Sequence, residues 1–156
     1  MTKQPPDCLS LSRELLRAIV ARLDPVLTPH GFSFHSEYNG VSSGGAFTNG
    51  FYVRLPIKIG LIVRGEKLGC PNYDWNEYQT GHNELIERLG SVKDSVLRFD
   101  SSFDKWELVT IDGRDVIDAF VADIETIILP AMINTPEKFA HAVITSHESR
   151  LARWSN

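Results

Sequence analysis

The sequence predicts an α+β fold, an antiparallel sheet of about five strands with helices packed on one face. Strand-like segments follow one another in hairpin-like groups instead of alternating with helices, which favours an antiparallel over a doubly wound parallel sheet. Helical periodicity marks both ends of the chain. The apolar content of 42% in 156 residues is ordinary for one globular core and excludes a largely disordered chain. The expected order is α-β-β-β-α-β-β-α-α in a single domain spanning 1–156, with residues 1–8 as a flexible tail.

The first element is an amphipathic helix. Apolar residues recur every three or four positions over residues 11–27, which is the spacing of one helix face. Pro29 and Gly31 then end the helix, because proline cannot continue it and glycine accepts the left-handed cap.

A first strand follows the helix. Phe32, Phe34 and Tyr38 alternate with polar residues, the pattern of a half-buried strand that ends in the turn-rich segment NGVSSGG. His35 is expected on the side opposite Phe32 and Phe34, either as a site residue or as an ordinary surface histidine.

Strict alternation marks the segment Phe47–Val63, in which every odd-numbered residue except Asn49 is apolar. Pro56 cannot donate to a ladder, so a tight connection near Leu55 and Pro56 is favoured over one bent strand. The odd-numbered residues are expected to face the core, under the first helix and a helix near Ile117.

The even-numbered face of this segment is the leading candidate site. It carries a tyrosine and cations with no acidic residue among them: Tyr52, Arg54, Lys58 and Arg64. Arginine and tyrosine are frequent anchors of recognition surfaces, so this face is expected to bind a protein partner or a small anionic ligand. The alternative is that these side chains are only the solvated residues of a half-buried strand.

The segment from Gly65 to Gly81 is predicted to be a long loop. Loops of this length within a domain are often functional. Tyr73 and Trp75 are therefore added to the candidate binding residues, since partly exposed aromatic residues are frequent interface anchors.

The second half of the chain is predicted to be mostly helical. A short helix covers 82–89, and strands at 95–99 and 105–111 are joined by a polar turn. A long helix runs from Ile117 to Pro130, and a last helix begins at Pro136.

An enzymatic alternative uses Asp74 and His82 together with His35. A histidine near a carboxylate can act as a general base, which would suit a small hydrolase or transferase. The chain contains no HExxH, CxxC or GxSxG motif, so no catalytic residue is assigned, and no cofactor or metal is expected.

Charge and hydropathy narrow the partner classes. A formal net charge of -4 argues against general nucleic-acid binding. No apolar run approaches the roughly 20 residues of a membrane span, and a cytoplasmic location is expected. Cys8 and Cys70 have no metal-ligand spacing and are interpreted as reduced thiols.

A structural alternative is a homo-oligomer. Its subunits would associate through sheet edges or through the last helix. That helix carries an apolar stripe that consists of Phe139, Val143, Leu151 and Trp154.

The helix that ends in LTPHGFSF, followed by the alternating strand segment, resembles small bacterial α+β families, some of which are immunity proteins of toxin systems. The resemblance covers about the first 65 residues and rests on this pattern and on the Gly31–Phe32 junction. It implies a binding role and supplies no catalytic residues.

Overall fold

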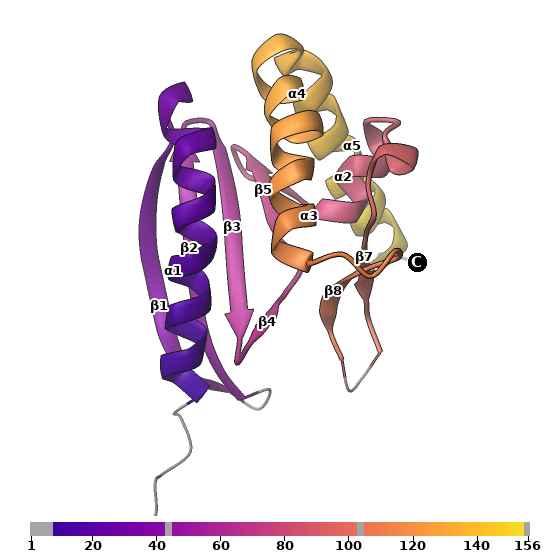
Figure 1. Cartoon of the computed structure of the whole chain (residues 1–156). Coiled ribbons are helices and arrows are strands. Elements are labelled where there is room, and N and C mark those ends of the chain that lie inside the picture. The colour runs from indigo at the N-terminus through magenta and orange to yellow at the C-terminus, as the bar shows by residue number, and fades with distance from the viewer. Residues whose placement is uncertain (1–7, 43–44, 103–104, 155–156) are drawn as a thin grey trace, which may run out of the picture.

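One antiparallel sheet organises the computed structural model, which describes residues 8–42, 45–102 and 105–154 (Figure 1). Its strands are β1 (Ser33–Ser42), β2 (Gly45–Arg54), β3 (Ile57–Arg64), β4 (Lys67–Leu68), β5 (Asn72–Trp75) and β6 (Tyr78–Gly81). The strand order is β1-β2-β3-β5-β6, and β4 pairs with the last residues of β3. The predicted α+β class with an antiparallel sheet is confirmed.

The remaining elements are helical except for one hairpin. The helices are α1 (Cys8–Leu27), α2 (His82–Arg88), α3 (Val116–Asp123), α4 (Leu129–Asn134) and α5 (Pro136–Trp154). The hairpin is β7 (Leu97–Asp100) with β8 (Glu107–Thr110), and it forms a separate sheet. The predicted tail over residues 1–8 lies mostly outside the described residues, and Cys8 already belongs to α1.

The prediction of a long loop between Gly65 and Gly81 is wrong. This segment contains β4, β5 and β6, and β5 pairs with β3 so that Tyr73 lies opposite Ile59. The strands are short and mostly polar because β5 and β6 bury only one side chain each, Tyr73 and Thr80. Alternation over four residues is too brief to be recognised by periodicity.

Pro130 does not end the long helix as predicted. A π-helical turn over Ile124–Ile128 joins α3 to α4, and Pro130 lies in the first turn of α4. Proline removes one helical donor and crowds the carbonyl four residues earlier, and a widened turn relieves that crowding. The helical path therefore continues to Asn134.

The turn between β2 and β3 is the predicted tight connection at Leu55 and Pro56, and it decides which side chains meet the core. In the resulting register Tyr52 lies opposite Ile59, so an even residue of β2 shares a face with an odd residue of β3. Tyr52 and Ile59 are both fully buried. The odd residues face the core only in β3, and the expectation that those of β2 do so is wrong.

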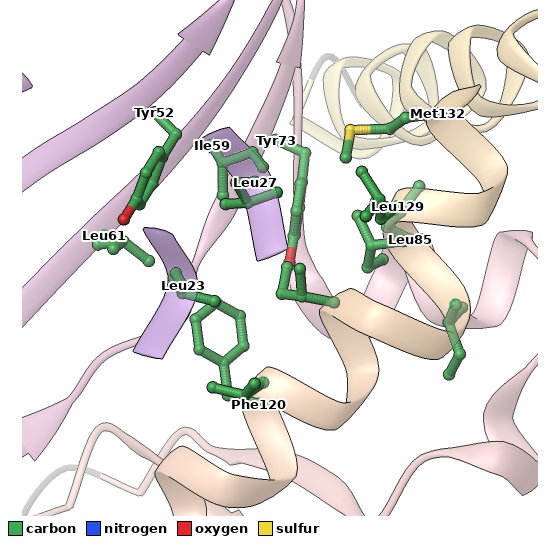
Figure 2. Close-up of a cluster of buried hydrophobic side chains, with 14 of the residues drawn as sticks. Leu23, Leu27, Tyr52, Ile59, Leu61, Tyr73, Leu85, Phe120, Leu129 and Met132 are labelled. Carbon is green, nitrogen blue, oxygen red and sulfur yellow. The ribbon is translucent and has the colours of Figure 1, made fainter. Parts of the chain in front are cut away.

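The helices gather on this buried face. α1 packs on β2 and β3, and α5 packs on β5 and β6. The helix near Ile117 was expected in the position that α5 occupies. That helix, α3, instead lies against α1 and the β7–β8 hairpin. Figure 2 shows side chains from α1, the sheet, α2, α3 and α4 converging in the core. The core is one continuous cluster that includes Leu23, Tyr52, Tyr73, Phe120 and Phe139.

Candidate functional site

The sheet face turned away from the helices is called the outer face below. Residues that alternate with Tyr52 in β2 and with Ile59 in β3 belong to it, because successive side chains of a strand point to opposite sides. The members that matter for the site are His35, Phe47, Asn49, Phe51, Val53, Lys58, Ile62, Arg64, Asn72, Asp74 and Gln79.

Two cations lie over two phenylalanine rings on the outer face. Nζ of Lys58 is 4.8 Å from the ring centroid of Phe51, and Cζ of Arg64 is 5.4 Å from that of Phe47. His35 stacks on Phe51 from the neighbouring strand, with ring centroids 5.4 Å apart. Cation–π contacts of this kind favour the observed positions of the cations. The outer face therefore presents half-buried aromatic residues covered by cationic side chains.

A hollow of about 310 Å³ lies beside this aromatic region. At its floor a Cβ on Gly60 would stand 2.6 Å from Oδ1 of Asn72, so only glycine lets the Asn72 side chain lie across β3. Asp74 accepts hydrogen bonds from Gln79 Nε2 at 3.0 Å and from Asn72 Nδ2 at 3.4 Å.

Acidic groups share the outer face with the cations. Asp74 lies opposite Lys58, and Glu37 accepts a hydrogen bond from Asn49 Nδ2 at 3.3 Å. The segment 47–64 itself contains no acidic residue, so the acidic groups come from neighbouring strands. The pattern of one strand did not include the carboxylates that β1 and β5 add.

Tyr52 and Tyr73 are buried and do not belong to the outer face. Tyr52 donates a hydrogen bond to Asp24 Oδ1 at 2.6 Å, and burial together with this contact raises its pKa above the ordinary value. Burial also raises the pKa of Tyr73, with a further contribution from the negative charge of Asp123. The placement of Tyr52 on the open face was wrong because the hairpin turns the even residues of β2 inward.

Arg54 and Trp75 lie together near the Leu55–Pro56 turn. Both line a small pocket of about 170 Å³ between the turn and the start of α5. Arg54 lies 6.0 Å from the ring centroid of Phe32, and Trp75 packs edge-on against Phe139. Of the candidate cations, only Lys58 and Arg64 lie on the outer face.

His82 belongs to a buried polar network that sequence reasoning missed. Its Nδ1 atom is 2.7 Å from the Tyr73 hydroxyl, and its Nε2 atom is 2.8 Å from Asp123 Oδ2. Ser95 Oγ donates to the same carboxylate oxygen at 2.6 Å. These side chains come from β5, α2, α3 and the segment before β7, and each is at most 3% exposed. The network ties four elements together inside the core.

The structure does not form the expected pair of Asp74 and His82. Asp74 lies on the outer face, whereas His82 is fully buried beneath the opposite face and pairs with Asp123. His35 is also on the outer face, stacked on Phe51 and within 3.2 Å of Ser33 Oγ. The three catalytic candidates therefore do not share a site.

Within residues 8–42, 45–102 and 105–154, no three His, Cys, Asp or Glu side chains gather as a metal site, and no helix is long and apolar enough to cross a bilayer. Cys70 is a free thiol whose pKa is raised by burial, and the side chain of Cys8 lies outside the described part.

Three residues of interest were not predicted. Phe47 and Phe51 were expected in the core, although the parity of a two-residue hairpin already requires β2 and β3 to bury residues of opposite parity. Asp123 carried no local signal, because it lies 41 residues from His82 and only the tertiary fold joins them.

Comparison of the chain with protein-family models, with curated proteins and with solved structures found no significant match.

Proposed function

We propose that this protein is a non-enzymatic, cytoplasmic binding module that takes a protein partner on the outer face of its sheet. The observation that carries the proposal is the placement of Lys58 and Arg64 over Phe51 and Phe47 on the face without helices. Aromatic residues and arginine dominate the energetics of protein interfaces.

The aromatic region favours a protein over a small anion. Phe47, Phe51 and Val53 are only half-buried, so a partner could remove further apolar area from water at roughly 25 cal/mol per Å². The neighbouring hollow carries Lys58 and Asp74, charges of both signs, which complement the alternating charges of a protein surface better than a single anion. The resemblance of the first 65 residues to immunity-protein-like families supports the same partner class, and an immunity-type role is the specific form it suggests.

The enzymatic alternative receives no support from the geometry. It required Asp74 and His82 within hydrogen-bond reach around a pocket, and these side chains lie on opposite sides of the sheet. The stripe of the homo-oligomer alternative is also divided, because Phe139 and Val143 are core residues while Leu151 and Trp154 are exposed.

The proposal is tested by partner capture with charge-reversed variants. Tagged wild-type protein and the double variant Lys58→Glu/Arg64→Glu are used to capture proteins from native lysate, and captured proteins are identified by mass spectrometry. We expect at least one specific partner whose affinity falls by about tenfold or more in the variant, because two anchors of the interface become repulsive.

The matched control is Arg54→Glu. This change reverses the same charge in the same hairpin, but Arg54 lies beside Phe32 and not on the outer face. The control should capture the partner as the wild type does. Equal capture by the folded double variant, or equal loss with Arg54→Glu, would show that the outer face is not the binding surface. A dimer in light scattering that the double variant dissociates would replace the partner with a second copy of this chain.

A further inference from the structure

A second hollow, on the opposite side of the sheet, lies between α1 and the inner side of β1. This groove has a volume of about 600 Å³, within the range of small-molecule sites. Its lining combines apolar side chains, which include Leu16, Val20 and Phe34, with polar and charged ones. The groove exists because α1 packs mainly on β2 and β3 and leaves the inner side of β1 partly open.

A bulge in β1 shapes the groove. The register of β1 against β2 shifts between Ser36 and Tyr38, so that Glu37 is the extra residue. The shift places Asn39 opposite Thr48 on the inner side, whereas unbroken alternation would have pointed Tyr38 inward. Tyr38 instead lies against Phe47 on the outer face, with ring centroids 5.3 Å apart. The bulge therefore replaces a large ring in the groove with a short amide.

Two arginines border one end of the groove. Arg13 and Arg17 are one helical turn apart on α1, and both are exposed. Across the described chain, no ion pair includes either guanidinium. Two adjacent like charges without a carboxylate partner favour an anion between them.

Unsatisfied polar atoms lie at the same end. Thr48 is only 3% exposed, and its Oγ1 atom has no hydrogen-bond partner among the described residues. Oδ1 of Asn39, on the neighbouring strand, also lacks one there. Buried polar atoms without partners are uncommon in native proteins. These two residues line the groove, so polar side chains accompany the arginines at this end.

The ends of the groove can be assigned from two hydrogen bonds. Ser12 donates to the carbonyl of Gly65, which places the start of α1 near the end of β3, and Tyr52 donates to Asp24 near the other end of α1. The arginines therefore lie at the end of the groove that contains Thr48. Asp24 lies at the other end together with Phe34, and Phe34 is the residue that pairs with Tyr52. Eleven residues separate Arg13 from Asp24, which corresponds to about 16 Å along the helix.

We propose that this groove binds an amphipathic carboxylate whose head group lies between Arg13 and Arg17 and whose aliphatic body lies along Leu16, Val20 and Phe34. Asp24 repels an anionic head group from the far end of the groove, so the carboxylate binds in one orientation.

The test uses dodecanoate as the probe. Isothermal titration of the whole chain should show one binding site for dodecanoate below its micellar concentration and no comparable binding of dodecyltrimethylammonium, which has the same tail and the opposite charge. Replacing both arginines, Arg13→Gln/Arg17→Gln, should weaken dodecanoate binding by about tenfold or more, since hydrogen bonds to charged groups are the strong ones.

A pair of alanines in α1 supplies a matched control for the tail. Ala21 lines the groove, whereas Ala18 is exposed and outside it. Ala21→Phe should therefore abolish dodecanoate binding by filling the space, and Ala18→Phe should bind as the wild type does. Arg88→Gln/Lys93→Gln removes the same charge at exposed sites elsewhere and should also bind normally.

Three results would overturn the proposal. They are failure of the folded wild type to bind dodecanoate, equal binding of the cationic probe, and unchanged binding by either Arg13→Gln/Arg17→Gln or Ala21→Phe. None of them bears on partner capture by Lys58 and Arg64, which lie on the other side of the sheet.

Discussion

The buried hydroxyl of Tyr73 is one end of the hydrogen-bond network around His82. Burial raises the pKa of Tyr73 well above its ordinary value, and its hydroxyl lies 2.7 Å from Nδ1 of His82. Nε2 of His82 hydrogen-bonds to Asp123, whose carboxylate also accepts from Ser95. Each of these four side chains has a hydrogen-bond partner in the network, which is what makes a polar network tolerable inside a core.

For this residue we predict the effect of Tyr73→Phe on the free energy of unfolding. The variant keeps the ring but leaves Nδ1 of His82 without its hydrogen-bond partner, at a cost of about 1–3 kcal/mol in the free energy of unfolding at pH 7. Urea denaturation measures this loss. Tyr38→Phe, at a hydroxyl on a side chain that is 56% exposed, should change it by less than about 0.5 kcal/mol.

Tyr73→Phe should also change how the free energy of unfolding depends on pH. The pKa of Tyr73 is higher in the folded than in the unfolded state, so above about pH 10 the unfolded chain loses a proton that the folded chain retains. The contribution of the Tyr73 proton to the free energy of unfolding is complete below about pH 10 and is lost as pH rises above that value. Tyr73→Phe should make the alkaline fall in stability shallower, and an unchanged slope would contradict a raised pKa.

Among the elements, the β2–β3 hairpin determines which side chains form the proposed binding surface. A two-residue turn pairs residues of opposite parity, since Tyr52 faces Ile59 and Val53 faces Lys58. Apolar residues at odd-numbered positions in both strands therefore cannot all be buried on one side of the sheet. β3 buries its odd residues, and β2 leaves Phe47 and Phe51 on the outer face, where Lys58 and Arg64 cover them.

For the helices, we predict that α1 contributes to stability mainly through its buried face. Leu23 is fully buried, so Leu23→Ala should lower the free energy of unfolding by about 2–5 kcal/mol through lost burial and a cavity. Leu151→Ala is the same substitution in α5 at a side chain that is 53% exposed, and should cost less than about 1 kcal/mol. Chemical denaturation of both variants compares them directly, and similar costs would contradict the packing of α1.

For the whole molecule, the core runs without interruption from Ile19 in α1 to Val143 in α5. The segment predicted to be a loop is what connects the two ends, since β5 pairs with β3 and carries Tyr73 to His82. The single domain expected over residues 1–156 stays a prediction, and the continuous core of the described residues is the reason to test it.

We predict that the chain unfolds in one cooperative transition. In the variant Trp106→Phe/Trp154→Phe the remaining tryptophan is Trp75, which packs against Phe139 of α5, so fluorescence reports contact between the sheet and the last helix. Far-ultraviolet circular dichroism reports all helices, and the two urea curves should coincide. Separate midpoints would mean that the halves form two domains.

The sequence by itself determined the fold class, the end of the first helix and the turn at Leu55 and Pro56. Each of these depends on local spacing or on the backbone limits of proline and glycine, which act within a few residues. Local pattern failed for β4–β6, whose short strands bury one residue at a time, and for the helix across Pro130.

Only the tertiary structure decided which residues meet. The partners of His82 come from β5 and α3, and the outer face combines side chains from β1, β2, β3 and β5. The groove under α1 depends on where a helix lies over a sheet and on one extra residue in β1. Such contacts join residues far apart in sequence, and no periodicity within one element specifies them.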